Sequence, residues 1–275
     1  CMADTFGVGE ADAVLPVVPM FHAAAWGMPF AALFTGAKIV LPGPLLDPTS
    51  LLELMAGERV TLAAGVPTIW LGILALLDQS PGTWDLKSVR AMLIGGSAAP
   101  PAMIDGFARR HGLSVTHAWG MTELQPVGTI AKLRHRHRDF PAADKLALRA
   151  SQGHALPFVE LRHVNDAGEV QPWDGQALGE LETRGPWVAS SYFGDEGADR
   201  FTSDGWFKTG DVVTLDAEGY VRINDRSKDV IKSGGEWISS VDLENAIMSH
   251  PKVKEAAVVG IPHPKWDERP LLLVV

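Results

Sequence analysis

The sequence predicts an α/β fold with an antiparallel, β-rich subdomain attached to it. In the first 125 residues, short apolar runs alternate with helix-like segments, which is typical of a parallel or mixed sheet covered by helices on both faces. After about residue 125, short strands of alternating apolar and polar residues are separated by turn signals. With 275 residues and 46% apolar composition, the chain is large enough to bury a substantial core.

The first elements follow from apolar runs and their breakers. Residues 13–19 predict a buried strand, and residues 23–33 predict an apolar helix. Residues 37–41 predict a short strand, which the Pro-Gly-Pro sequence at 42–44 ends. Asp47 or Ser50 is the expected N-cap of a helix that runs to about residue 57.

The same alternation continues to residue 118. Residues 60–64 predict a strand, and Pro67 in a first turn predicts a helix to about residue 77. Residues 89–94 predict the next strand, followed by a tight turn at Gly95-Gly96-Ser97. A helix over 100–111 and a strand over 113–118 complete the α/β part.

The second half is expected to be a small antiparallel barrel or sandwich. Residues 159–164 and 179–185 alternate as half-buried strands do. Residues 241–250 predict an amphipathic helix, because the spacing of Val241, Leu243, Ala246 and Ile247 fits one. Residues 256–261 and 271–275 predict strands. Because the chain begins on Cys1 and stops inside a strand, we expect it to be a fragment.

Charge and cysteine content narrow the function classes. The net charge is -9, so the surface disfavours nucleic acid and anionic lipid, and the basic run 132–138 is interpreted as a solvated loop. One cysteine cannot form an intramolecular disulfide, which favours the cytoplasm. The uncharged runs 13–37 and 60–77 contain prolines and are interpreted as buried strand and helix, so no transmembrane segment is expected.

Several motifs carry chemistry. Trp119-Gly120-Met121-Thr122-Glu123 follows a predicted strand, where α/β folds bind ligands, and offers a hydroxyl and a carboxylate of the kind that nucleotide-bound Mg²⁺ prefers. Asp211 is suited to accept two ribose hydroxyls, although it also fits a plain turn. Residues 225–238 combine cations with Gly234-Gly235 at the junction to the amphipathic helix, which suits phosphate contacts and a hinge.

In their order along the chain, these motifs resemble the adenylate-forming superfamily, which includes acyl-CoA synthetases, amino-acid adenylation domains and firefly luciferase. The resemblance rests on Val-Pro-Met-Phe-His at 18–22, Gly-Gly-Ser-Ala at 95–98, and the segments 119–123, 206–211 and 225–238. The run 232–244 is most similar to bacterial medium- and long-chain fatty acid–CoA ligases.

The resemblance implies the domain organisation and the reaction. It implies a large N-terminal domain over 1–224, with an α/β part over 1–125 and a β-rich part over 126–224. A small C-terminal domain over 225–275 would rotate about a hinge at Asp225. The implied reaction activates a fatty acid with ATP and Mg²⁺ through acyl-AMP and then forms a thioester with CoA.

The resemblance also implies site residues, position by position. The implied catalytic residues are Thr122, Glu123, Arg226, Lys228 and Lys232, with Glu123 as the Mg²⁺ ligand. The implied nucleotide-binding residues are Gly96, Ser97, Trp119, Gly120, Thr122, Asp211, Arg226 and Trp237. His22 and Trp26 match positions beside the acyl channel, with Trp26 as a candidate gate, and Gly234 and Gly235 border the implied CoA path. Trp119 stands where the family more often has tyrosine, which keeps a π face for stacking.

Two departures and several alternatives accompany this interpretation. The Gly/Ser/Thr-rich phosphate loop and the C-terminal adenylating lysine of the family do not occur in the chain, so full activity is not expected from these residues alone. An apolar acid is favoured because residues 13–37 contain no Asp or Glu to pair a substrate ammonium. The alternatives are an acyl-adenylating enzyme that loads a carrier protein and a truncated homologue that only binds acyl or nucleotide ligands. A homodimer is left open.

Overall fold

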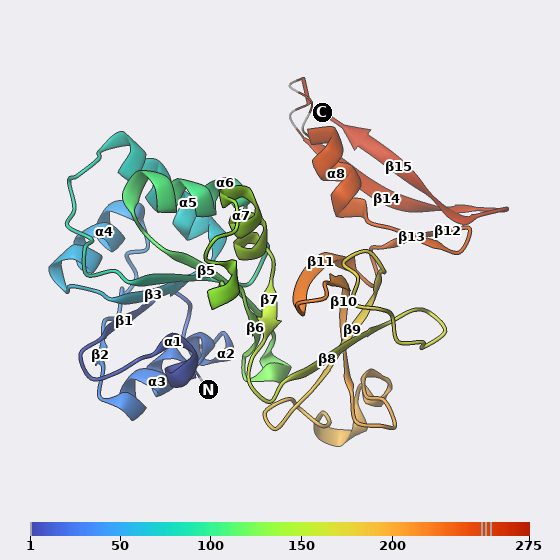
Figure 1. Ribbon diagram of the computed structural model, residues 1–275, viewed down its shortest axis with the longest axis horizontal. Coiled ribbons are helices and arrows are strands. Elements are labelled where there is room, and N and C mark those ends of the chain that lie inside the picture. Colours follow the sequence, from blue (N-terminus) through green and yellow to red (C-terminus); the bar gives the residue numbers. More distant parts are fainter. Residues whose placement is uncertain (1, 249, 251, 254) are drawn as a thin grey trace. The chain divides into compact units, whose positions relative to one another are not determined.

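The computed structural model describes residues 2–248, 250, 252–253 and 255–275. The chain forms two compact units, Cys1–Phe158 and Val159–Val275 (Figure 1). The domain boundary expected at residue 225 stays a prediction.

The first unit is built on a mixed sheet, as the sequence predicts. Strands β1 to β5 are all parallel, in the order β2-β1-β3-β4-β5, and β6 and β7 follow in antiparallel pairing. Their bounds are β1 Ala13–Pro16, β2 Lys38–Ile39, β3 Leu62–Gly65, β4 Ala91–Ile94, β5 Val115–Gly120, β6 Val127–Ile130 and β7 Gly153–Ala155. The central strands β1 and β3 are buried along their whole length, because helices cover both faces of a parallel sheet.

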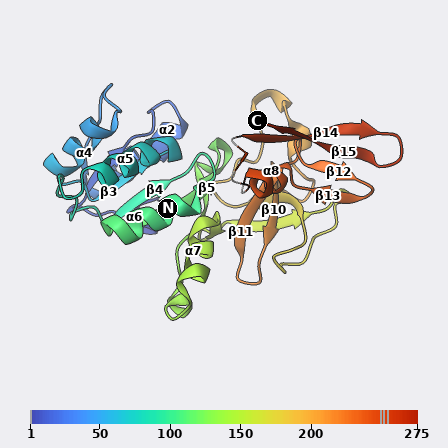
Figure 2. The same ribbon diagram turned by 90° about the horizontal axis from the view of Figure 1, so that it is seen from above.

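Helices cover this sheet on both sides (Figures 1 and 2). Helices α4, α5, α6 and α7 pack one against the next, and α3 packs against β1 and β2. The main core cluster joins Leu52, Ile73 and Phe107 of the first group to Leu15 and Met92 of the sheet. The helices are α1 Met2–Phe6, α2 Ala23–Trp26, α3 Met28–Thr35, α4 Pro48–Gly57, α5 Pro67–Gln79, α6 Pro101–His111 and α7 Ala142–Ala150.

Local sequence signals explain where two of these helices begin. Asp47 is the N-cap of α4, since its Oδ1 accepts the backbone N–H of Ser50 at 3.0 Å. Pro67 occupies the first turn of α5, where its missing N–H costs no intrahelical bond. The fully buried Trp70 of α5 donates from Nε1 to the carbonyls of Gly65 and Leu93, both at 3.0 Å. These bonds hold the helix against the ends of β3 and β4.

The helix expected over 23–33 is wrong in its first half. Residues Ala23 to Trp26 have φ between 44° and 55°, so α2 is a left-handed turn, and Gly27 at φ 69° leads into the right-handed helix α3. Apolar periodicity cannot distinguish the two hands. Left-handed backbone costs about 1–2 kcal/mol for each non-glycine residue, so tertiary packing must hold this turn.

Helix α7 is a second difference from the sequence prediction, which expected no helix between residue 125 and the amphipathic helix over 241–250. It is a nine-residue amphipathic helix whose Leu146 and Ala150 pack against the main core. None of its residues is fully buried, so its sequence shows only a weak form of the apolar pattern from which a helix is predicted.

A polar cluster ties the beginnings of β1, β3 and β4 together. The Asp12 carboxylate binds Arg90 through two bonds, Nε to Oδ1 at 2.9 Å and Nη2 to Oδ2 at 3.0 Å, and accepts the Thr61 hydroxyl. These three residues each precede a strand, and we call them the strand-start cluster. The Arg90 bond lowers the pKa of Asp12 to about 2, against the opposing effect of burial.

The second unit is antiparallel, as the sequence predicts. Strands β8 Glu160–Val164, β9 Gly179–Arg184, β10 Phe207–Leu215 and β11 Tyr220–Arg226 form a meander in chain order. A smaller sheet has the order β13-β12-β15-β14, with β12 Ile231–Ser233, β13 Glu236–Ile238, β14 Ala256–His263 and β15 Asp267–Val274. Helix α8 (Ser240–Met248) packs against β14.

The two-residue turn between β12 and β13 requires glycine. Gly234 and Gly235 have φ of +61° and +88°. A two-residue hairpin turn with positive φ at both positions matches the twist of its strands, and non-glycine residues adopt it at a cost.

Candidate functional site

A cavity of about 250 Å³ opens in the first unit where β4 and β5 end. Three loops supply its walls: the turn after β4, the segment after β5, and the chain that follows β1. Its lining residues are His22, Ala23, Trp26, Leu93, Gly95, Gly96, Ala118, Trp119, Gly120, Met121, Thr122, Glu123, Pro126 and Val127. The carboxyl ends of parallel strands meet at one edge of a sheet, so segments distant in sequence converge there.

Two glycines let the backbone approach its neighbours at this cavity. A Cβ on Gly95 would lie 3.2 Å from both the Ala118 carbonyl and the Trp26 ring. A Cβ on Gly120 would lie 1.8 Å from the Pro126 carbonyl oxygen, a separation that no side chain tolerates. The loop that carries Thr122 and Glu123 therefore keeps its position only with glycine at 120.

The left-handed turn α2 delivers Trp26 to the cavity. The indole is 8% exposed and lies against the Gly95-Gly96 turn. His22 precedes α2 and is exposed at the same cavity. The two residues expected beside an acyl channel thus share one cavity with residues expected at the nucleotide.

Thr122 and Glu123 lie in a short 3-10 turn, η1 (Thr122–Leu124), directly after β5. Leu124 is buried beneath the turn, so the hydroxyl and the carboxylate are presented on its outer side, where Thr122 is exposed and Glu123 half-buried. Mg²⁺ on a nucleotide is commonly held by one or two carboxylates together with the substrate phosphates. The donor set at η1 fits that pattern, and within the part of the chain that the structure describes no cluster of three His, Cys, Asp or Glu side chains forms an all-protein metal site.

Sequence reasoning missed part of the cavity lining. Ala23, Leu93, Ala118, Met121, Pro126 and Val127 line it but were not predicted as site residues. They are apolar and adjoin the predicted motifs, so adjacency was the only available signal. Ser97, which was predicted, is exposed in the same turn as Gly96 but does not line the cavity.

The second unit holds the remaining predicted residues, beginning with Asp211 on β10 and Arg226 on β11. Asp211 is 1% exposed, and its Oδ1 lies 2.8 Å from Arg226 Nη1. The register of β10 and β11 sets these two residues directly opposite each other. The residue expected to hold ribose and a residue expected to contact ribose or phosphate thus form an ion pair.

Lys232 and Trp237 meet on Asp166, in the turn that follows β8. Lys232 forms an ion pair with Asp166 Oδ1, and Trp237 Nε1 donates to Oδ2 at 2.9 Å. Burial raises the pKa of Asp166, but the bonds from Lys232 and Trp237 outweigh burial and lower that pKa overall. The Lys232 ammonium also lies 5.1 Å from the centre of the Trp237 ring.

Asp225 is buried and anchors the start of α8. Its Oδ2 accepts the Ser240 N–H at 2.7 Å and the Ser240 hydroxyl at 2.8 Å. Lys228, by contrast, is exposed in the turn between β11 and β12. Gly234 and Gly235 form the hairpin turn described above.

Comparison with known proteins identifies the family. A model of AMP-binding enzymes matches residues 1–193, which is more than half of the chain. The chain belongs to the AMP-binding enzyme family. A model of the AMP-binding enzyme C-terminal domain matches residues 242–275 as well.

Several relatives of this chain carry the name of a CoA ligase. It is 52% identical over 276 residues to a long-chain-fatty-acid–CoA ligase of Thermus thermophilus, covering 100% of this chain and 50% of that protein. It is 49% identical over 274 residues to a medium-chain-fatty-acid–CoA ligase of Ectopseudomonas oleovorans, with the same coverage. The chain thus spans about half the length of the curated relatives that it matches.

Solved structures agree with the fold. The o-succinylbenzoate CoA synthetase of Bacillus subtilis, in complex with its acyl-adenylate intermediate, superposes with a TM-score of 0.81 at 30% identity, over 99% of this chain and 53% of that one. The same enzyme has been solved with ATP and a magnesium ion. None of the helices described in our chain is both long and apolar enough to cross a membrane.

Proposed function

We propose that this chain is part of an ATP-dependent, AMP-forming ligase that joins a fatty acid to CoA. The observation that carries the proposal is the single cavity shared by His22 and Trp26 with Trp119, Thr122 and Glu123. Such a site can hold an acid and a nucleotide side by side. The names of relatives about 50% identical to the chain support the same activity.

The proposed reaction needs no protein nucleophile. A carboxylate oxygen of the acid attacks the α-phosphorus of ATP, a new oxygen–phosphorus bond forms, and pyrophosphate leaves. The CoA thiol then attacks the acyl carbonyl, and AMP leaves as the thioester forms. In such phosphoryl and acyl transfers, the protein contributes orientation and stabilisation of developing charge.

The roles of the cavity residues follow from their chemistry. Trp119 offers a π face against which a nucleobase stacks. Glu123 and Thr122 hold Mg²⁺ and phosphate, and the metal supplies charge neutralisation at the phosphates when it is bound. Trp26, with most of its ring buried, limits how far an acyl tail enters.

The residues of the second unit serve the nucleotide and the second half-reaction in this proposal. Asp211 and Arg226 contact the ribose and phosphate, as do Lys228 and Lys232, and Trp237 covers the nucleotide. Gly234 and Gly235 border the CoA path. Asp225 is the proposed hinge, since it is the penultimate residue of β11 and its carboxylate accepts a bond from Ser240, the first residue of α8.

A second acid remains a candidate for a specific reason. A relative from Ruegeria pomeroyi that is 51% identical over 272 residues is named 3-methylmercaptopropionyl-CoA ligase, so similarity alone favours short thioether acids as much as fatty acids. The absence of Asp and Glu from residues 13–37 is compatible with both. A carrier protein as the acyl acceptor, a homodimer and a cytoplasmic location stay predictions.

The test removes the charge of Glu123 in the intact protein. Glu123→Gln should lower the release of pyrophosphate from fatty acid and ATP by about 100-fold or more, because a neutral amide cannot replace a carboxylate at the metal. Glu53→Gln, on the exposed side of α4, removes an equal charge elsewhere and should leave the rate unchanged. Release at the wild-type rate from Glu123→Gln, with an unchanged melting temperature, would refute the metal assignment.

A further inference from the structure

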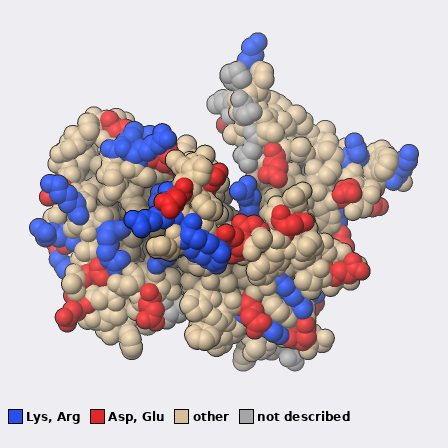
Figure 3. All heavy atoms as spheres, in the orientation of Figure 1, with Lys and Arg blue, Asp and Glu red and all other residues tan. Residues whose placement is uncertain are grey.

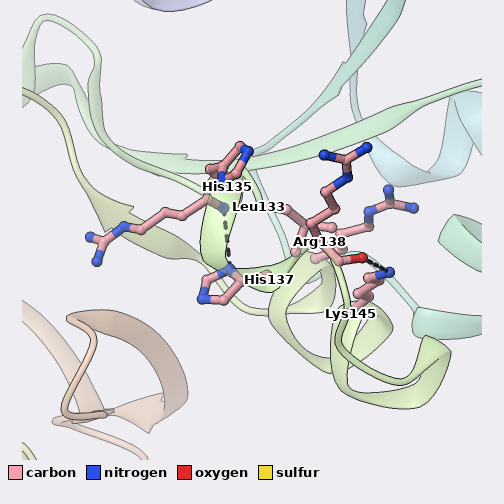
Figure 4. Close-up of a pocket in the computed structure, with 7 residues that line it drawn as sticks. Leu133, His135, His137, Arg138 and Lys145 are labelled. Carbon is pink, nitrogen blue, oxygen red and sulfur yellow. Dashed lines mark hydrogen bonds between the residues drawn. The ribbon is translucent and has the colours of Figure 1, made fainter.

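A second pocket, of about 350 Å³, lies in the first unit between a 3-10 turn, η2 (His135–His137), and helix α7 (Figure 4). It shares no lining residue with the cavity described above. Six of its seven lining residues carry basic side chains: Arg134, His135, His137, Arg138, Lys145 and Arg149. No acidic residue lines it, although the net charge of the chain is -9.

Three cations of this basic pocket keep their charge without an ion-pair partner in the described part of the chain. Arg138, Lys145 and Arg149 form no ion pair with any carboxylate that the structure describes. The Lys145 ammonium donates to the backbone carbonyl of Arg138 at 2.6 Å (Figure 4), which fixes its position but leaves its charge intact. The neighbouring Asp139 and Asp144 are exposed and do not line the pocket.

Local structure holds the basic groups in place. Arg138 follows the single turn of η2, and Lys145 and Arg149 lie four residues apart on α7, so they share one face of the helix. The buried His137 accepts the Arg134 N–H on Nδ1 at 3.1 Å, which leaves Nε2 as the donor of the ring. Figure 3 shows one face of the molecule, on which Lys and Arg side chains are frequent over the first unit.

The chemistry favours phosphate as the ligand group. Guanidinium groups match phosphate oxygens with paired N–H donors, and several cations in one pocket suit an anion with more than one charge. The volume falls within the range of small-molecule sites. A nucleic-acid groove would instead need several exposed aromatic rings along a basic stripe, whereas Phe140, which is 40% exposed and has its ring centre 4.9 Å from that of His137, does not line this pocket.

We propose that the basic pocket binds a small molecule carrying a diphosphate or two separate phosphate groups. This site is distinct from the ligase cavity, and the inference does not depend on the proposed ligase activity.

Binding of two probes tests the proposal on the full chain. Inorganic pyrophosphate represents a diphosphate, and adenosine 3′,5′-bisphosphate represents two separate phosphates. We expect calorimetry to show binding of at least one probe that weakens as salt rises. The double variant Arg138→Gln/Arg149→Gln should weaken it at least about tenfold. Arg109→Gln, an exposed arginine of α6 that pairs with Asp105, is the matched control and should change affinity less than twofold.

Hydrogen exchange locates the bound probe. The probe that binds should slow exchange in peptides covering residues 133–149 of the wild type and not of the double variant. Unchanged affinity in the double variant, no binding of either probe, or tighter binding of single-stranded RNA than of both probes would overturn the proposal. Lys145→Gln, which leaves both arginines in place, repeats the test if the double variant does not fold.

Discussion

The strand-start cluster gives a prediction whose size can be worked from the structure. Asp12→Asn keeps the shape of the side chain but removes the charge that faces Arg90. The pKa of Asp12 is lowered from 3.8 to about 2, chiefly by the Arg90 bond. A shift of that size corresponds to about 2.5 kcal/mol of folding free energy at neutral pH. The Arg90 side chain is 40% exposed, so solvent screening reduces the expected loss to about 1–2 kcal/mol.

The sign of the pH dependence follows from the depressed pKa. The folded state holds Asp12 ionised more strongly than the unfolded state does, so the contribution is complete above the unfolded pKa near 3.8. It is lost as the pH falls from about 4 through about 2, where both states become protonated. Wild type and Asp12→Asn should therefore differ at pH 7 and converge at acid pH.

Hydrogen exchange by mass spectrometry measures this loss in the first unit alone, through peptides that cover β1, β3 and β4. The control is Asp105→Asn, which breaks an exposed pair with Arg109 on α6 and should leave exchange nearly unchanged. A loss of equal size at pH 7 and pH 3, or one no larger than that of the control, would refute the role of charge in the cluster.

Three further predictions concern the site. Gly120→Ala should lower the free energy of unfolding by about 1–3 kcal/mol and reduce adenylation, because the new Cβ collides with the Pro126 carbonyl. Urea unfolding and pyrophosphate release measure the two effects. The control Gly57→Ala, which has open space around its Cβ, should change neither. Trp26→Ala should shift the preferred acid toward longer chains, whereas a loss of about 3–5 kcal/mol with unchanged preference would make Trp26 a core residue. Asp225→Pro should keep the formation of acyl-AMP and slow the transfer of the acyl group to CoA, because proline restricts the backbone at the proposed hinge. The control Asp225→Ala should lower the rates of both steps alike. An equal loss in both steps for the proline variant would place the hinge elsewhere.

Elements with a strong local signal were predictable from the sequence. Helix α4 follows from Asp47 as a cap and α5 from Pro67 in its first turn, and both signals depend only on neighbouring residues. The parallel strands were recognisable as apolar runs too short for helices. Their carboxyl ends carry the motif residues, so convergence of these residues at one sheet edge was predictable as well.

Features that depend on distant contacts were not predictable. The left-handed turn at α2 is unfavourable locally and is recognisable only from its packing beside Gly95. The bond between Asp12 and Arg90 joins residues 78 positions apart, and the Asp166 contact with Lys232 joins residues 66 positions apart. Composition counts residues and periodicity describes neighbouring ones, so neither predicts which distant residues form a pair.

The strand-start cluster and the candidate site lie at opposite ends of the same strands. Bonds that fix the strands at the cluster therefore also fix the positions of the loops that line the cavity. Strands β1, β3 and β4 have four residues each and so span only about 13 Å. A shift of one residue at the cluster would turn every side chain to the other face and move the loops beyond the strands. The bidentate pair between Asp12 and Arg90 opposes that shift between β1 and β4. The loops after these strands bring Trp26 against Gly95, so a fixed register at one edge of the sheet positions the cavity at the other.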